Sequence, residues 1–105
     1  MTRGEVWWAE LAGDAGFRPV IIVSRSEAIG RRRNITIAEV TRVVRSLPSE
    51  VHLSIEDDMP SDCVINTDNL HTIPQDRLRQ RITMISEEHL FSLERALRYS
   101  LDLQW

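Results

Sequence analysis

The chain has 105 residues, a formal net charge of −3 at pH 7 and 42% hydrophobic residues, which is ordinary for one globular domain. Its apolar runs are shorter than the ~18 residues that span a bilayer, and Met1 to Glu5 holds no signal-peptide-like segment. A lone cysteine excludes an internal disulfide, and the three histidines lack the close spacing of a zinc site. We therefore expect one cytoplasmic domain over residues 1–105, with no membrane contact, metal or cofactor.

The charged residues are distributed unevenly. Residues 1–50 carry eight arginines and six acidic residues, whereas residues 51–105 carry five arginines and ten acidic residues. Within residues 18–45, seven arginines stand against Glu27 and Glu39, a local balance of +5. A basic patch on an otherwise acidic domain predicts a localised site for a polyanion.

Strand-like segments separated by turn residues occupy most of the chain up to residue 85. The near-continuous apolar run from Pro19 predicts a central strand, because proline is tolerated where a strand opens. Residues 25–34 read as a loop or a short helical turn. The strands predicted from apolar runs and two-residue alternation are Glu5–Glu10, Pro19–Ser24, Ile35–Val44, Val51–Ile55, Cys63–Asp68 and Arg81–Ile85. Alternation places one set of side chains on a shared face, namely Ile35, Ile37, Glu39 and Thr41.

The tail of the chain predicts a helix. Ser86 is a suitable N-cap, and Glu87 and Glu88 place negative charge at the positive end of the helix dipole. Leucines follow at helical spacing, at positions 90, 93, 97 and 101. Many short strands and one terminal helix predict a mainly β (α+β) fold, a small, partly closed barrel with a C-terminal α-helix on its sheet.

Two residues of this sheet have side chains suited to a phosphate. Arg18 stands at the head of the apolar strand, fixed by Pro19, where its guanidinium donors can stabilise charge on a phosphorane and on a leaving oxygen. Thr41 can place a hydroxyl on a phosphate oxygen. Each residue alone also fits a plain role, Arg18 as a surface arginine and Thr41 as a common strand residue.

Further polar residues follow the Cys63 strand and the Pro19 strand. Asp68 and Asn69 fit either a turn or a carboxylate base beside an amide that reads a base edge. His71 fits a structural role or acid–base chemistry near neutral pH. The run of arginines at 31–33 fits a solvated surface or, beside the candidate site, a track for a phosphate backbone.

Four segments in order carry a resemblance to a known family: Arg3-Gly4-Glu5-Val6-Trp7, Arg18 to Arg25, Ile37 to Thr41 and Asp62 to Ile73. Together with the leucine-rich tail helix, they resemble the MazF/PemK (Kid-type) toxins of toxin–antitoxin systems over nearly the whole chain. The resemblance implies an SH3-like barrel, a homodimer and inhibition by a cognate antitoxin. It also implies metal-independent endoribonuclease activity that leaves a 2′,3′-cyclic phosphate and a 5′-hydroxyl and so blocks translation.

The family pattern implies that Arg18 and Thr41 are the catalytic arginine and threonine and that Asp68 is an acidic catalytic residue. We expect RNA, as mRNA, tRNA or rRNA, to contact Arg25, Arg31, Arg32, Asn69 and His71. The chain departs from the pattern in its short Gly13-to-Phe17 loop, in Asn66, where some members have arginine, and in His71, where arginine is usual. The acid and base are therefore open between Asp68, His71 and Arg18.

Two other functions remain. A barrel of this kind also occurs in CcdB-like toxins, which bind DNA gyrase without catalysis, and the terminal Gln104-Trp105 is similar to their C-terminal tryptophan region. A non-cleaving RNA-binding domain is the other. The Arg18 and Thr41 arrangement favours the ribonuclease, and the need to rotate a 2′-oxygen into line with the leaving oxygen favours unpaired RNA.

Overall fold

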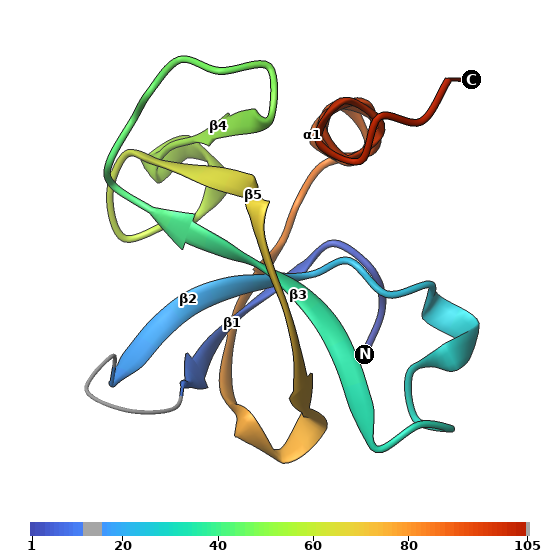
Figure 1. The fold of residues 1–105 in the computed structure, drawn as a ribbon. Helices are drawn as coiled ribbons and strands as arrows, with labels where there is room; N and C mark the ends of the chain where they lie inside the picture. The colour runs from blue at the N-terminus through green and yellow to red at the C-terminus, as the bar shows by residue number, and fades with distance from the viewer. Residues whose placement is uncertain (12–15, 105) are drawn as a thin grey trace.

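The computed structural model describes residues 1–11 and 16–104, and within them it contains six strands, three short 3-10 helices and one α-helix (Figure 1). In chain order these elements are β1 (Glu5–Glu10), β2 (Phe17–Ile22), η2 (Ser26–Ala28), β3 (Asn34–Thr41), β4 (Glu50–Leu53), η3 (Ile55–Asp57), β5 (Cys63–Pro74), η4 (Gln75–Arg77), β6 (Leu78–Met84) and α1 (Glu87–Ser100). None of the described helices is long and apolar enough to cross a membrane. Most of the Gly13-to-Phe17 loop, and Trp105, lie outside the described residues.

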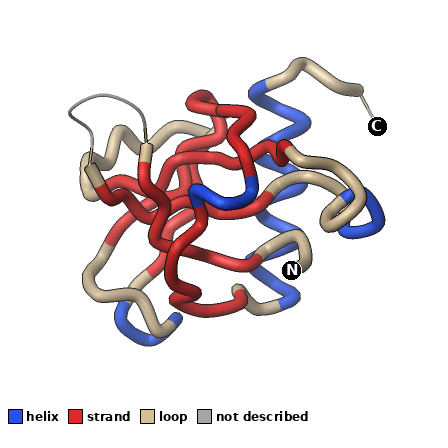
Figure 2. The backbone as a smooth tube through the Cα atoms, turned by 90° about the horizontal axis from the view of Figure 1, so that it is seen from below, coloured by secondary structure: helices blue, strands red, loops and turns tan. Residues whose placement is uncertain are grey.

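The strands form one antiparallel sheet in the order β4-β5-β3-β2-β1-β6. Strand β5 pairs with β3 over two stretches, because Glu39 lies opposite Asn66 and its neighbour Ala38 lies opposite Leu70. The residues between Asn66 and Leu70 form a bulge, and bulges bend a strand. The sheet therefore curls, and Figure 2 shows α1 along one side of it. The expected mainly β, partly closed barrel with a C-terminal helix is confirmed, as is the interior position of β2.

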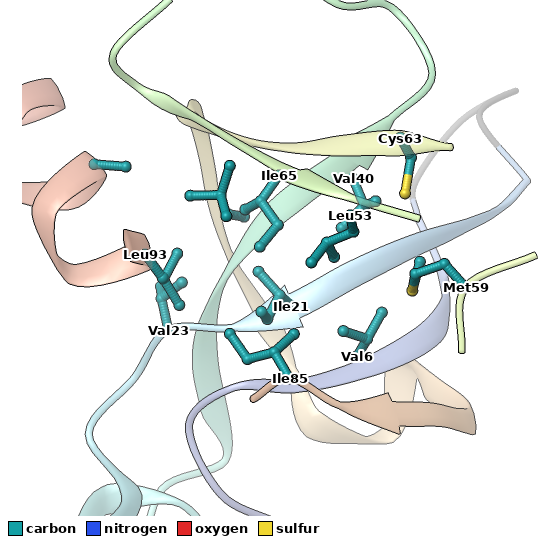
Figure 3. Close-up of a cluster of buried hydrophobic side chains, with 13 residues drawn as sticks. Val6, Ile21, Val23, Val40, Leu53, Met59, Cys63, Ile65, Ile85 and Leu93 are labelled. Carbon is teal, nitrogen blue, oxygen red and sulfur yellow. The ribbon is translucent and has the colours of Figure 1, made fainter. Parts of the chain in front are cut away.

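Buried side chains gather on both faces of the curled sheet. On the face toward α1, Val6, Ile21 and Ile65 pack with Leu93 of the helix (Figure 3). On the other face, Val20, Ile22, Ile35, Ile37, Ala9 and Leu78 form a second cluster. Since Val20 and Ile22 alternate with Ile21, strand β2 is buried on both sides, which explains its near-continuous apolar sequence. This strand is a rigid base for the residue at its head, Arg18.

The terminal helix begins and packs as predicted. The Ser86 hydroxyl accepts a hydrogen bond from the His89 amide at 3.1 Å, which caps the first turn. Leu93 is fully buried, and Leu90 and Leu97 pack against the same cluster. Leu101 lies beyond the last helical residue and is 52% exposed, so it does not continue the buried stripe.

Several predicted boundaries were wrong. Ile55 belongs to η3 and is 68% exposed, because Ser54 and Asp57 cap that helical turn and end β4 at Leu53. Strand β3 ends at Thr41, three residues earlier than predicted, where its pairing with β5 ends. Strand β5 continues to Pro74 because its second half pairs with the start of β3. These differences arise from pairing partners, which alternation within one segment does not reveal.

Candidate functional site

The start of β2 and the end of β3 separate from one another (Figure 1). The two strands pair over only three positions, from Val20 opposite Glu39 to Ile22 opposite Ile37. Opposed residues of antiparallel strands project to the same face, and residues two apart on a strand share a face. The side chains of Arg18, Glu39 and Thr41 therefore project from one face of the sheet, around the point where the two strands part. We call this region the strand-parting face.

Arg18 and Thr41 occupy defined positions on this face. Arg18 is exposed in the second position of β2, opposite Ala9 of β1, and Pro19 follows it. Thr41 is half-buried at the last position of β3, and its hydroxyl oxygen accepts a hydrogen bond from the Val43 amide at 3.1 Å. Because a hydroxyl can also donate, the Thr41 proton can be directed to an anionic oxygen. A guanidinium and a hydroxyl on one face can thus contact a single phosphate group.

A carboxylate–imidazole pair lies on the same face. The His71 Nε2 atom is 2.5 Å from Glu39 Oε2, and the two side chains are 47% and 32% exposed. His71 lies opposite Ile37 in the register, so the contact is diagonal across β3 and β5. Strand alternation predicts Glu39 on the face of Thr41, but no function was expected for it. The sequence feature that could have indicated a role for Glu39 is an acidic residue two positions before Thr41, within the basic segment of residues 18–45.

Asp68 and Asn69 lie in the bulge of β5. The Ser49 hydroxyl, which is fully buried, donates a hydrogen bond to Asp68 Oδ2 at 2.6 Å. The Asp68 amide donates to Asn66 Oδ1 at 2.9 Å, and Asn66 lies opposite Glu39. Asn69 is exposed. The bulge therefore holds the Asp68 carboxylate in a fixed orientation one strand away from β3.

Three predicted RNA-binding residues lie elsewhere. Arg25 follows the far end of β2, and Arg31 and Arg32 follow η2 (Figure 1). Arg25 is separated from Arg18 by roughly 20 Å of extended chain. The arginine run at 31–33 thus lies away from the strand-parting face rather than beside it. The structure brings Arg18, Thr41 and His71 to one face and places these arginines at the opposite end of β2.

Arg25 and Arg32, but not Arg31, border a groove of about 1050 Å³ between η2, β3, β5 and α1. We call it the arginine groove, after its five arginines: Arg3, Arg25, Arg32, Arg33 and Arg98. Among its described lining residues the one acidic side chain is Glu94, and Arg3 Nη1 lies 3.5 Å from it. Leu70, Leu97 and Leu101 add apolar surface. The groove therefore has an excess of positive charge and suits an anionic chain.

Cys63 has no part in the strand-parting face. Burial raises the pKa of its thiol, and the neighbouring carboxylates Asp62 and Asp57 raise it further. Because the thiolate is the reactive form of cysteine, the buried Cys63 thiol is poorly suited to catalysis. Among the described residues, no group of three or more His, Cys, Asp or Glu side chains is placed to hold a metal ion.

Comparison with known proteins gives the chain's family. A family model described as "PemK-like, MazF-like toxin of type II toxin-antitoxin system" matches residues 2–101. The chain is 41% identical over 101 residues to a probable endoribonuclease MazF2 of Mycobacterium tuberculosis, covering 95% of this chain and 97% of the relative. It is 35% identical to a probable endoribonuclease MazF5 of the same species, covering 95% of this chain and 92% of the relative.

Solved structures share the fold over the whole chain. The Mycobacterium tuberculosis toxin MazF-mt6 superposes with a TM-score of 0.88 at 29% identity, covering 96% of this chain and 99% of the other. An endoribonuclease in complex with its cognate antitoxin from a mycobacterial species superposes with a TM-score of 0.89 at 25% identity, covering 100% and 98%. The strands that carry Arg18, Glu39, Thr41 and His71 lie within the matched regions.

Proposed function

The chain belongs to the PemK-like, MazF-like toxin family of type II toxin–antitoxin systems, and from that premise we propose that it cleaves single-stranded RNA at the strand-parting face. The protein is a toxin with endoribonuclease activity, as its relatives' names imply. The proposed reaction is attack of a ribose 2′-oxygen on the adjacent phosphorus, without a metal. It leaves a 2′,3′-cyclic phosphate and a 5′-hydroxyl, and cleavage of transcripts inhibits translation and growth.

The observation that carries this proposal is the shared face of Arg18 and Thr41 where β2 and β3 part. In the transition state, negative charge develops on the non-bridging phosphate oxygens and on the leaving 5′-oxygen. The Arg18 guanidinium can donate to both, because its donors form a rigid fork. The Thr41 hydroxyl can donate to a second phosphate oxygen. Burial of Val20, Ile21 and Ile22 on both sides anchors the strand whose exposed start carries Arg18, which holds its backbone in place before the substrate binds.

RNA contacts divide between two regions under this proposal. Asn69 and His71 lie in β5 near the cleavage position and contact the nucleotides around the cut. Arg25 and Arg32, with Arg31 beside them, lie on or near the arginine groove and bind the phosphates of flanking RNA. Asp68, held by Ser49, is the third proposed catalytic residue. Unpaired RNA is the substrate because its backbone can rotate the 2′-oxygen into line with the leaving oxygen.

The partners follow from the family. Because a family member has been solved with its cognate antitoxin, this toxin is expected to bind an antitoxin as well. We place its action in the cytoplasm, where transcripts are translated. We also propose a homodimer of single-domain chains, each spanning residues 1–105. Exposed apolar side chains of α1 outside the arginine groove, Phe91 and Tyr99, support an intersubunit contact there.

The test is cleavage of a mixed pool of single-stranded RNA in EDTA. The wild type is expected to cut at a limited set of sequences, and mass spectrometry is expected to find 2′,3′-cyclic phosphate and 5′-hydroxyl ends. Arg18→Ala is expected to lose roughly 10²- to 10³-fold in rate, because one transition-state donor is removed. Arg95→Ala is the matched control, since Arg95 is exposed on α1 and does not line the arginine groove.

Other outcomes would identify the competing functions. RNA that stays intact with the wild type would refute the ribonuclease. Intact RNA together with inhibition of DNA gyrase would identify a CcdB-like toxin. Tight RNA binding without cutting would identify a plain RNA-binding domain. Equal cutting of duplex and single-stranded RNA would refute the preference for unpaired RNA.

A further inference from the structure

We propose that Glu39 and His71 act as a proton-transfer pair in RNA cleavage, with His71 as the general base and Glu39 as its positioning residue. This inference rests on the proposed function and assigns the proton acceptor that Arg18 and Thr41 leave open. The observation behind it is the 2.5 Å contact between His71 Nε2 and Glu39 Oε2 on the strand-parting face.

The contact fixes the tautomer of the imidazole. An ionised carboxylate only accepts hydrogen bonds, so Nε2 of His71 must carry the proton that Glu39 binds. In the neutral ring the other nitrogen, Nδ1, then holds a lone pair. A lone pair at a defined position, on a ring held by a carboxylate, is the arrangement that a general base requires. When Nδ1 takes a proton, the Glu39 carboxylate also stabilises the resulting imidazolium.

The position of the pair agrees with this role. Glu39 is two residues from Thr41 on β3, about 7 Å along the strand, and it lies opposite Val20, two residues from Arg18 on β2. His71 itself lies opposite Ile37, which is about 13 Å along β3 from Thr41. A nucleotide, together with the long side chains of Arg18 and His71, can bridge that span. The face is open to substrate, because His71 is 47% exposed and Glu39 is 32% exposed.

The Glu39–His71 pair contributes little to the stability of the fold. Exposed ion pairs contribute at most about 1 kcal/mol, and part of that is lost in fixing two flexible side chains. The contact is also diagonal, so it does not reinforce a directly opposed pair of the β3–β5 ladder. A carboxylate inside the basic segment of residues 18–45 weakens binding of a polyanion at that position. A role in proton transfer accounts for an acidic residue there.

Other charged groups lie near the pair. Arg18 of β2 shares its face, Asp68 lies on the same strand as His71, and Glu50 of β4 lies opposite Asn66. The Asp68 carboxylate is bonded to Ser49, and the Glu50 carboxylate accepts from the amides of its own loop. Glu39 is thus the carboxylate in direct contact with the imidazole among the described residues.

In the proposed cleavage step, the bond between the 2′-oxygen and phosphorus forms as the bond between phosphorus and the 5′-oxygen breaks. The 2′-hydroxyl proton passes to His71 Nδ1, and water supplies a proton to the 5′-oxygen while the Arg18 guanidinium stabilises its charge. The imidazolium afterwards returns its proton to water. The products are a 2′,3′-cyclic phosphate and a 5′-hydroxyl, with no net oxidation.

The experiment compares His71→Ala, Glu39→Gln and the control Arg95→Ala, whose arginine is exposed on α1 and does not line the arginine groove. Single-turnover cleavage of an RNA that the wild type cuts gives the rate. Binding of the same RNA with 2′-deoxyribose at the cut gives the affinity, and thermal unfolding checks the fold. We expect His71→Ala to lose about 10²- to 10³-fold in rate with its affinity within about threefold of wild type. Arg95→Ala should keep both.

Two further readouts separate chemistry from structure. Free imidazole should restore His71→Ala at least tenfold, because it supplies the missing base. Glu39→Gln should lose about tenfold, since the amide oxygen still accepts from Nε2 but gives the imidazolium no charge stabilisation.

Three results would refute the proton-transfer role proposed for His71 and Glu39. These are a His71→Ala rate close to wild type, a loss confined to RNA affinity, and a folded His71→Ala protein that imidazole does not restore. If the wild type itself cuts no RNA, the proposed function fails and the pair with it. An active wild type with an unaffected His71→Ala variant refutes the pair alone.

Discussion

The two ends of β2 carry different kinds of charge. At its start, Arg18 shares a face with a hydroxyl, Thr41, and with a carboxylate–imidazole pair. Beyond its end, five arginines line a groove whose one described acidic residue already contacts Arg3. Groups of both signs can move protons and stabilise developing charge, whereas a surplus of one sign attracts a polyanion without acting on it. The comparison predicts that catalysis and binding can be impaired separately.

Among the variants that separate the two ends of β2, Arg18→Lys is expected to have the largest effect on the rate. Lysine keeps the positive charge but lacks the planar fork, so the phosphate is still attracted while the transition state is poorly matched. The single-turnover rate should fall roughly 10²-fold, with RNA affinity nearly unchanged. Rapid-quench cleavage and filter binding measure the two quantities. A variant that loses affinity and keeps its rate would show that Arg18 belongs with the binding region.

The next effect concerns the arginine groove and the double variant Arg32→Ala/Arg33→Ala. Both side chains line the groove, and each charged hydrogen bond to a phosphate is worth about 1.5 kcal/mol. Affinity for long single-stranded RNA should fall roughly 10- to 100-fold, while the rate at saturating RNA stays near wild type. The slope of log affinity against log salt should flatten by about 0.7 for each lost contact. If the double variant and Arg95→Ala have the same slope, RNA does not bind in the arginine groove.

A smaller effect is expected from Ser49→Ala. This variant tests whether Asp68, in the β5 bulge, takes part in catalysis at the strand-parting face. The variant removes the 2.6 Å hydrogen bond that orients Asp68. Losing one hydrogen bond should lower the free energy of unfolding by about 1 kcal/mol. If Asp68 takes part in catalysis, the rate should also fall severalfold. Chemical denaturation and single-turnover cleavage report the two effects, and an unchanged rate would leave Asp68 a structural residue.

The smallest effect on activity is expected from Glu5→Gln, which lies outside both regions. Burial raises the pKa of the Glu5 carboxyl, but hydrogen bonds from Trp7 and Thr2 and the nearby N-terminus outweigh it and lower that pKa below 4.5. The folded protein therefore holds this proton less tightly than the unfolded chain, so the stabilisation is present above about pH 4.5 and is lost as pH falls. Glu5→Gln should cost about 1 kcal/mol at pH 7.

Denaturation across pH tests that expectation. The difference in unfolding free energy between wild type and Glu5→Gln should shrink toward pH 3, while cleavage at pH 7 stays within about twofold of wild type. If the difference in unfolding free energy instead grows as the pH falls, the pKa of Glu5 is not lowered in the folded protein.

Much of the fold was predictable because local rules determine it. The Ser86 cap, the buried strand after Pro19 and the shared face of Ile35, Ile37, Glu39 and Thr41 each depend on spacing within one segment. Ile55 was mispredicted because Ser54 and Asp57 cap a helical turn that alternation does not detect. The length of β5 was missed because its second half exists through pairing with β3.

By itself the sequence determined the family, the mainly β fold and the identities of Arg18 and Thr41 as a candidate phosphate-binding pair, since ordered motifs and strand periodicity are local properties. Tertiary structure alone decided which charged groups meet. The bulge in β5 brings His71 diagonally onto Glu39, and the length of β2 separates Arg25, Arg31 and Arg32 from Arg18. The physical reason is that register and curvature set the distances between strands, and neither is encoded in the spacing along any one of them.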